Sequence, residues 1–155
     1  MNEHITLNTG ASSVTLTAVD GTWSLAIGAL NTDLGNDIKY AGALAVTGIA
    51  DEVAALTNYT TAKTGANTNT LKANDEIWSV SAADLTTALA DGVRFADSLT
   101  VKDIPSDAEA AALTAYTKAL TGATTITLKA SNNVWSVAAT TLDTALAAKV
   151  LLAGD

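Results

Sequence analysis

The sequence predicts an α/β fold, a solenoid-like repeat stack of ββαβα units with the sheet on one side and the helices on the other. Three observations predict it: a motif that contains one tryptophan occurs three times, an amphipathic stretch follows each copy, and a short apolar run follows the first two of those stretches. The copies span residues 15–25, 70–80 and 127–137, and their tryptophans, Trp23, Trp78 and Trp135, lie 55 and 57 residues apart. A period of this size indicates supersecondary units that stack on one another.

We expect residues 1–155 to form a single repeat domain. Repeat one covers residues 9–63, repeat two covers residues 64–120, and a truncated repeat three covers residues 121–155. Each repeat opens with Thr-Gly-Ala, and the glycines are Gly10, Gly65 and Gly122. Glycine is the preferred residue just beyond a helix, so we expect the tripeptide to end the preceding helix.

Each copy of the motif predicts a β-hairpin. Apolar residues alternate with threonines before the turn, as in Val14, Leu16 and Ala18, which is the period of a strand with one buried face. The turn residues tolerate the positive φ that a tight hairpin requires. The polar residues at and beside these turns are Asp20, Asn74, Asp75, Glu76, Asn132 and Asn133. The tryptophan then lies on the returning strand.

An amphipathic helix is expected after each hairpin. In repeat two it begins at Ser81, a good N-cap, and Asp84 lies in its first turn. Apolar residues at positions i, i+4 and i+8 predict one buried helix face. They are Leu30, Leu34 and Ile38 in repeat one, Leu85, Leu89 and Val93 in repeat two, and Leu142, Leu146 and Val150 in repeat three.

A third strand and a second helix complete the unit. The strand is expected at residues 44–46 and 99–101. In repeat two Pro105 ends the strand, and Ser106 and Glu109 have the spacing of a capping box. The apolar faces of the second helices are expected to be Val53, Leu56 and Tyr59 in repeat one, and Leu113, Tyr116 and Leu120 in repeat two.

Composition and charge argue against several classes of protein. The chain has a net charge of −8 and only eight lysines and arginines, so it has no basic patch for nucleic acid or an anionic membrane. It has no apolar run of about 18 residues, so we expect no membrane insertion. It has no cysteine, which excludes disulfides and thiolate metal sites. The first residues lack the basic and apolar regions of a signal peptide.

Residues 125–130 and 135–137, followed by an Ala/Thr-rich helix, resemble the Ala/Thr-rich repeats of very large secreted bacterial proteins. Those are the RTX-type, adhesin-like and surface-layer-like polypeptides, and residues 99–103 before an Ala-rich helix are similar to the same repeats. The resemblance covers nearly the whole chain. It implies a structural role outside the cell or at its surface and carries over no catalytic residues. The glycine-aspartate nonapeptides that bind calcium in RTX proteins are absent, so it does not imply calcium binding.

Two sets of residues are candidates for ligand contact. The tryptophans could stack on sugar rings, or each could anchor its hairpin in the core, and their repeated place on a strand favours packing. Tyr40 and Phe95 share one equivalent position, and Tyr59 and Tyr116 share another, which also favours packing. The oxygens of the turn residues could ligate calcium. No two carboxylates recur at ligand spacing in all three copies, which favours turn chemistry instead.

An enzyme is not expected, nor a metal or cofactor. His4 is the only histidine and there is no cysteine, so we expect neither a Ser-His-Asp or Cys-His site nor a zinc site. Two functions stay open: a structural module of a bacterial surface assembly, and an adhesion module that binds glycans through its tryptophans. For the first, the expected partner is a second copy bound head-to-tail, or the neighbouring repeats of a longer chain. Ile5 and Leu7 at one end, and Leu151 and Leu152 at the other, are the residues expected to associate into filaments.

Overall fold

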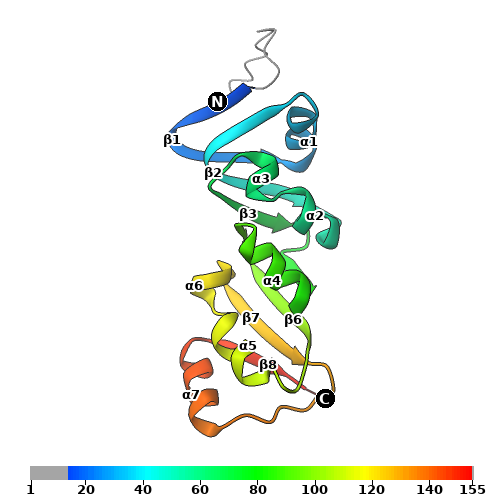
Figure 1. Cartoon of the computed structure of the whole chain (residues 1–155), viewed down its shortest axis with the longest axis vertical. Coiled ribbons are helices and arrows are strands. Elements are labelled where there is room, and N and C mark those ends of the chain that lie inside the picture. The colour runs from blue at the N-terminus through cyan, green and yellow to red at the C-terminus, as the bar shows by residue number, and fades with distance from the viewer. Residues whose placement is uncertain (1–13, 155) are drawn as a thin grey trace.

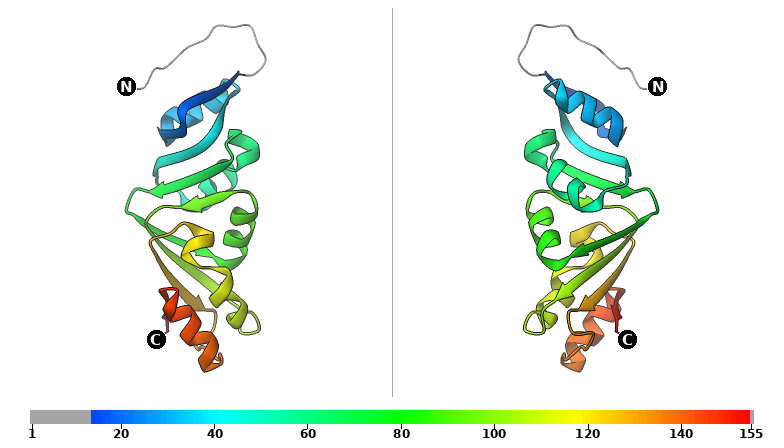
Figure 2. Two further views of the ribbon diagram at one scale, coloured as in Figure 1. Left: turned by 90° about the vertical axis from the view of Figure 1, so that its left-hand side faces the viewer. Right: turned by 90° about the vertical axis from the view of Figure 1, so that its right-hand side faces the viewer.

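The computed structural model describes residues 14–154, which form a mixed α/β structure with two four-stranded sheets (Figure 1). The first sheet has the order β1-β2-β3-β5 and the second has the order β4-β6-β7-β8. All six strand pairings are parallel, because helices or short helical segments connect the paired strands. The molecule is elongated, with β1 at one end and α7 and β8 at the other (Figure 2).

The strands of the first sheet are β1 (Val14–Ala26), β2 (Ile38–Ile49), β3 (Thr68–Ala73) and β5 (Val93–Phe95). Those of the second are β4 (Ile77–Ser81), β6 (Ser98–Ile104), β7 (Thr125–Ala130) and β8 (Val150–Ala153). The helices are α1 (Ile27–Gly35), α2 (Glu52–Asn58), α3 (Thr61–Thr64), α4 (Ala82–Ala90), α5 (Glu109–Ala115), α6 (Lys118–Thr121) and α7 (Ala139–Ala147). The predicted third strands are confirmed within β2 and β6. Repeat two has one more strand and one more helix than the expected ββαβα unit.

The predicted hairpins are wrong. In repeat two β3 pairs with β5 and β4 pairs with β6, so the two halves of the motif belong to different sheets. In repeat one the motif is the single strand β1, whose pairing with β2 shifts between Thr17 and Thr22. In repeat two the motif is therefore a corner at which the chain leaves one sheet and enters the next. Each pair of strands is separated in sequence by at least one helix, and this crossover brings the second strand alongside the first in parallel.

The turn chemistry of the corner recurs in all three copies. The backbone N–H just after the turn donates to a side-chain oxygen two residues earlier: Thr22 to Asp20, Ile77 to Asp75 and Val134 to Asn132, at 3.0–3.1 Å. The residue between them has a positive φ of 60–74°: Gly21, Glu76 and Asn133. This Asx turn explains why the accepting positions are Asp or Asn, although the turn does not make a hairpin.

Several helix boundaries are as predicted. Ser81 is the N-cap of α4, and its hydroxyl accepts a hydrogen bond from the Asp84 N–H at 3.1 Å. Gly65 and Gly122 end α3 and α6 with φ of +81°. A Cβ on Gly65 would lie 2.9 Å from the Cβ of Lys39, so both the backbone conformation and the close approach require glycine. Gly10 lies outside the described residues.

The predicted i, i+4, i+8 helix face is confirmed only in part. Leu30 and Leu85 are fully buried, whereas Leu34 and Leu89 are half-buried and Leu146 is 51% exposed. The buried partners lie at i+3 instead, and they are Asp33, Ala88 and Ala145. The i+8 residues Ile38, Val93 and Val150 begin the next strands. Each helix has only nine residues, so it ends before its third turn can place an i+8 residue on the same face.

The second helices are shorter than expected. Helix α5 begins at Glu109 after Ala108, which makes no side-chain cap, so the predicted cap at Ser106 is wrong. Leu56, Tyr59, Leu113 and Tyr116 are buried as predicted. Val53 and Leu120 are 59% and 49% exposed and do not belong to the buried faces. Leu120 lies in the separate helix α6, which turns it away from the face of α5.

One cluster of buried apolar side chains extends from Leu30 to Val150 and joins both sheets to the helices. Its largest members come from the middle of the chain and include Trp78, Phe95, Leu71, Leu85 and Leu99. The described residues therefore share a continuous core, as the repeat pattern predicts.

Candidate functional site

The three tryptophans occupy the same position after the corner but differ in burial. Trp78 is fully buried, and its ring meets that of Phe95 edge-to-face with centroids 5.0 Å apart. Trp23 is half-buried and makes the same contact with Tyr40 at 5.1 Å. This confirms that Tyr40 and Phe95 are equivalent.

Trp135 is also half-buried, and it lacks an aromatic neighbour of this kind among the described residues because Leu152 stands where Phe95 stands in repeat two. Its indole N–H donates to the carbonyl of Ala153 at 3.2 Å. Trp78 is therefore inaccessible to a sugar ring, contrary to the predicted platform of three tryptophans. Trp23 and Trp135 are the two that reach solvent. This burial pattern is that of residues that pack strands onto the core.

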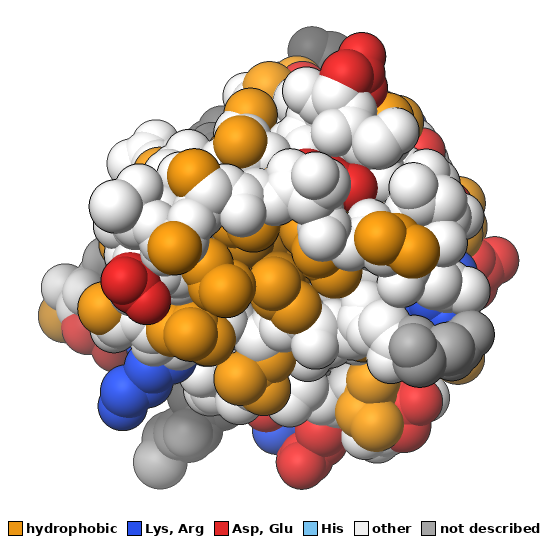
Figure 3. All heavy atoms as spheres, turned by 90° about the horizontal axis from the view of Figure 1, so that it is seen from below, with side chains coloured by type: hydrophobic (Ala, Val, Ile, Leu, Met, Phe, Trp, Pro, Cys, Tyr) orange, Lys and Arg blue, Asp and Glu red, His pale blue; other side chains and the backbone are white. Residues whose placement is uncertain are grey.

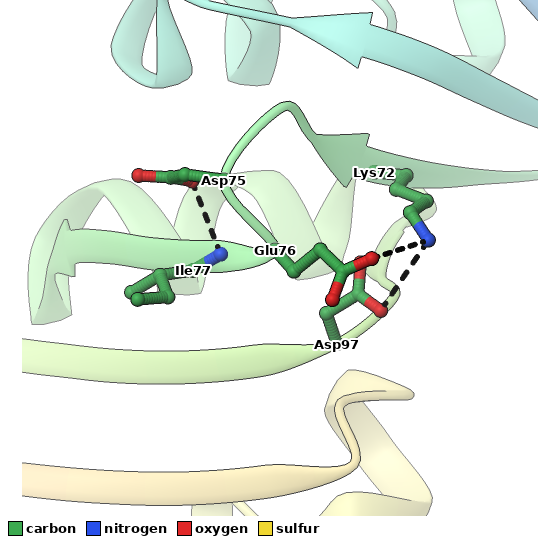
Figure 4. Close-up of polar contacts among 5 residues, drawn as sticks. All are labelled: Lys72, Asp75, Glu76, Ile77 and Asp97. Atoms are coloured by element: carbon green, nitrogen blue, oxygen red, sulfur yellow. Dashed lines mark hydrogen bonds and ion pairs between the residues drawn. The ribbon is translucent and has the colours of Figure 1, made fainter.

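Most of the polar side chains at the corners form hydrogen bonds within the same turn. The side-chain oxygens of Asp20, Asp75 and Asn132 accept from their own backbone, as described above. The Lys72 ammonium lies 3.3 Å from Glu76 and 3.8 Å from Asp97 (Figure 4). The Lys72 side chain is 42% exposed, so these ion pairs add little stability. Within residues 14–154 no three Asp, Glu, His or Cys side chains are grouped closely enough to hold a metal ion.

Two glutamates that the sequence analysis did not single out for this role bind the motif to the preceding helices. The Glu52 carboxylate accepts the backbone N–H of Ser79 at 2.7 Å, and the Glu109 carboxylate accepts that of Ser136 at 2.6 Å. In both cases the partners lie 27 residues apart. Glu109 is only 1% exposed. The signal in the sequence is that each second helix begins with a glutamate, which we interpreted in repeat two as part of a capping box.

Tyrosine hydroxyls tie the helices to their neighbours. Tyr59 donates to Asn31 Oδ1 at 2.7 Å, and the Tyr116 hydroxyl lies 2.9 Å from Thr86 Oγ1. Burial raises the pKa of Tyr59 above its ordinary value, and the hydrogen bond with Asn31 partly opposes the rise. Each bond joins the segment after a second helix to the first helix of the same repeat.

Tyr40 is buried and donates its hydroxyl hydrogen to the Asp33 carboxylate. Burial raises the pKa of Tyr40 well above its ordinary value, and the hydrogen bond and negative charge of Asp33 raise it further. The tyrosine is therefore held in its neutral, donating form. This bond fixes α1 against β2, which is a structural role.

The residues predicted to associate are only partly described. Ile5 and Leu7 lie outside the described residues, as does His4. Leu151 is 49% exposed and Leu152 is half-buried, and both lie on β8, the edge strand of the second sheet. Apolar side chains gather over the end of the molecule that α7 and β8 form (Figure 3).

Comparison with known proteins found no matching family model, and neither the curated proteins nor the solved structures include a significant match. In the part of the chain that the structure describes, no helix has the length and apolar character needed to cross a bilayer.

Proposed function

We propose that this chain is a non-enzymatic structural repeat module of a bacterial extracellular or cell-surface assembly, in which ββαβα-like units stack as in a solenoid. The observation that supports it is a recurring hydrogen bond from a serine backbone N–H to a glutamate carboxylate. Ser79 donates to Glu52 and Ser136 donates to Glu109, over the same 27 residues. Recurrent contacts between successive units are what a stack requires.

The strand pairings recur as well. The β2–β3 register shifts between Val46 and Ile49, and the β6–β7 register shifts between Val101 and Ile104, at the same place in the two repeats. The order in repeat two is two strands, a helix, two strands and two short helices. Repeated units that contact only their neighbours can extend into long, regular structures.

Composition and the resemblance to large secreted bacterial proteins support the proposed location. The chain is rich in alanine and threonine, as those repeats are. The proposed partner is the chain itself, bound head-to-tail, or the neighbouring repeats of a longer chain. We propose neither binding to nucleic acid nor insertion into a membrane.

Electron microscopy of the purified protein tests the proposal. We expect rods or fibres whose length grows with protein concentration, because heterologous contacts between identical units do not close. A variant with Leu151→Asp should shorten them, since it places a carboxylate on the apolar end. Isolated particles of constant size at every concentration would argue against self-assembly.

The alternative is a glycan-binding adhesion module, and it is favoured by the partial exposure of Trp23 and Trp135. Titration with soluble oligosaccharides should then quench tryptophan fluorescence. Trp135→Ala should remove part of this response if the alternative holds. Emission that stays blue-shifted and unaffected by sugars favours the structural function.

A further inference from the structure

We propose that the end of the molecule formed by α7 and β8 binds a second copy of this chain by accepting the edge strand β1 of that copy beside residues 134–138. This inference rests on the head-to-tail association proposed above and identifies its two surfaces. The C-terminal face, as we define it, consists of Trp135, Val137, Leu142, Leu146 and Leu151.

Three residues of the C-terminal face, Trp135, Val137 and Leu142, have the sequence of core positions but are not fully buried. In repeat two the corresponding residues Trp78, Val80 and Leu85 are at most 1% exposed. In repeat three Trp135, Val137 and Leu142 are only half-buried. Leu146 and Leu151 are 51% and 49% exposed. An apolar patch of this kind on a soluble domain marks a place of contact, and Figure 3 shows it from below.

Repeat two shows which kind of segment covers the residues that correspond to the C-terminal face. There β6 pairs in parallel with β4, with Trp78 opposite Leu99 and Val80 opposite Val101. The Tyr116 hydroxyl then binds Thr86 of α4. Among residues 14–154 no strand pairs with residues 134–138. The cover that fits is therefore a parallel strand with alternating apolar side chains.

Only one edge of residues 134–138 is open to such a strand. Successive N–H groups of a strand point to opposite edges, and Glu109 accepts that of Ser136 just as Glu52 accepts that of Ser79. In repeat two the edge opposite the glutamate is the one that receives β6. The corresponding edge of repeat three is the proposed binding edge.

Strand β1 of a second copy has the properties that this edge requires. It is the edge strand of the first sheet. Its Thr15-Leu16-Thr17-Ala18 has half-buried Leu16 and Ala18 between exposed threonines, the same alternation as Ser98-Leu99-Thr100-Val101 of β6. Parallel addition also continues the pairing that every described strand makes.

The register follows from the match between the two strands. Since Ser79 lies opposite Thr100 within the chain, Ser136 should lie opposite Thr17 of the second copy. The two faces are different, so each copy can bind one neighbour at either end, and the assembly propagates as a filament.

Cysteine cross-linking tests this register, because the natural chain has no cysteine. A mixture of the Thr17→Cys and Ser136→Cys variants should form a disulfide-linked dimer, or one joined by a short thiol cross-linker. Ser79→Cys is the matched control, since Ser79 sits at the same position of a motif whose binding edge is already occupied by β6. We expect on the order of tenfold more dimer than in the mixture with Ser79→Cys, because docking raises the local thiol concentration.

The variants Val137→Asp and Leu151→Asp test whether the C-terminal face itself is needed for association. Sedimentation measures their oligomeric state, and circular dichroism checks that they are folded. Loss of both the cross-link and the oligomers in a folded variant supports the proposal. Oligomers that form without the Thr17–Ser136 cross-link would overturn this interface while leaving head-to-tail association intact. A strictly monomeric chain at high concentration would overturn both. A last variant carries a further copy of residues 98–122 fused to the chain end. If this segment buries the C-terminal face and the unfused chain never associates, the face binds the next repeat of the same chain. The second-copy proposal then fails.

Discussion

Truncating Leu85 to alanine should destabilise the fold far more than the same change at Leu89. Leu85 is 0% exposed and contributes to the central cluster, whereas Leu89 is half-buried at the end of the same helix. Removing a fully buried leucine side chain costs about 2–5 kcal/mol, which combines lost transfer free energy with the cavity left behind. At Leu89 solvent already reaches the side chain, so we expect less than about half of that cost.

Chemical denaturation followed by circular dichroism measures both costs, and calorimetry checks whether unfolding is a single transition. For a chain of this length each kcal/mol corresponds to about 2–4 °C in melting temperature, so Leu85→Ala should lower it by several degrees. Equal destabilisation by the two variants would show that α4 buries the i+4 face that the sequence predicts. No change in either would show that α4 does not pack on the core.

Three further predictions concern polar groups. Glu109→Ala should cost about 1–3 kcal/mol in denaturation, because it leaves the Ser136 N–H without its acceptor, and Glu52→Ala, at a half-buried position, should cost less. Stability should fall as the pH rises above about 10, the ordinary tyrosine pKa, because the unfolded chain then releases protons that folded Tyr40 retains; Tyr40→Phe should flatten this part of the pH profile, and an unchanged slope would contradict the reasoning. Melting in chelator and in millimolar calcium should give the same midpoint, whereas a rise with calcium would reveal a site.

The sequence predicts well what depends on local chemistry. Ser81 caps its helix because a hydroxyl can accept the exposed N–H groups of a first turn. Gly65 and Gly122 end helices because they adopt positive φ without strain. The mixed α/β class also follows, since strand and helix periods alternate along the chain.

What the sequence predicts wrongly depends on contacts between distant segments. The turn at Asp75 has the residues of a hairpin turn, and nothing local distinguishes a hairpin from a corner between two sheets. The pairing is decided by α4 and β5 together, which carry the chain from β4 to β6. The role of Glu109 is hidden for the same reason, because its partner Ser136 lies 27 residues away.

The burial of the tryptophans follows from this dependence on neighbouring layers. Trp78 is fully buried because β6 pairs with β4 beside it. Trp135 lies at the same position of its motif, but no described strand pairs with its segment, and it stays half-buried. If the units stack as proposed, with each layer touching only its neighbours, the outermost layers should open at a lower free energy than the middle. Hydrogen exchange should therefore be slowest in β4 and β6 of the isolated chain. If a second copy binds the C-terminal face, protection should rise first at residues 134–138, because this segment gains the neighbour that β4 already has.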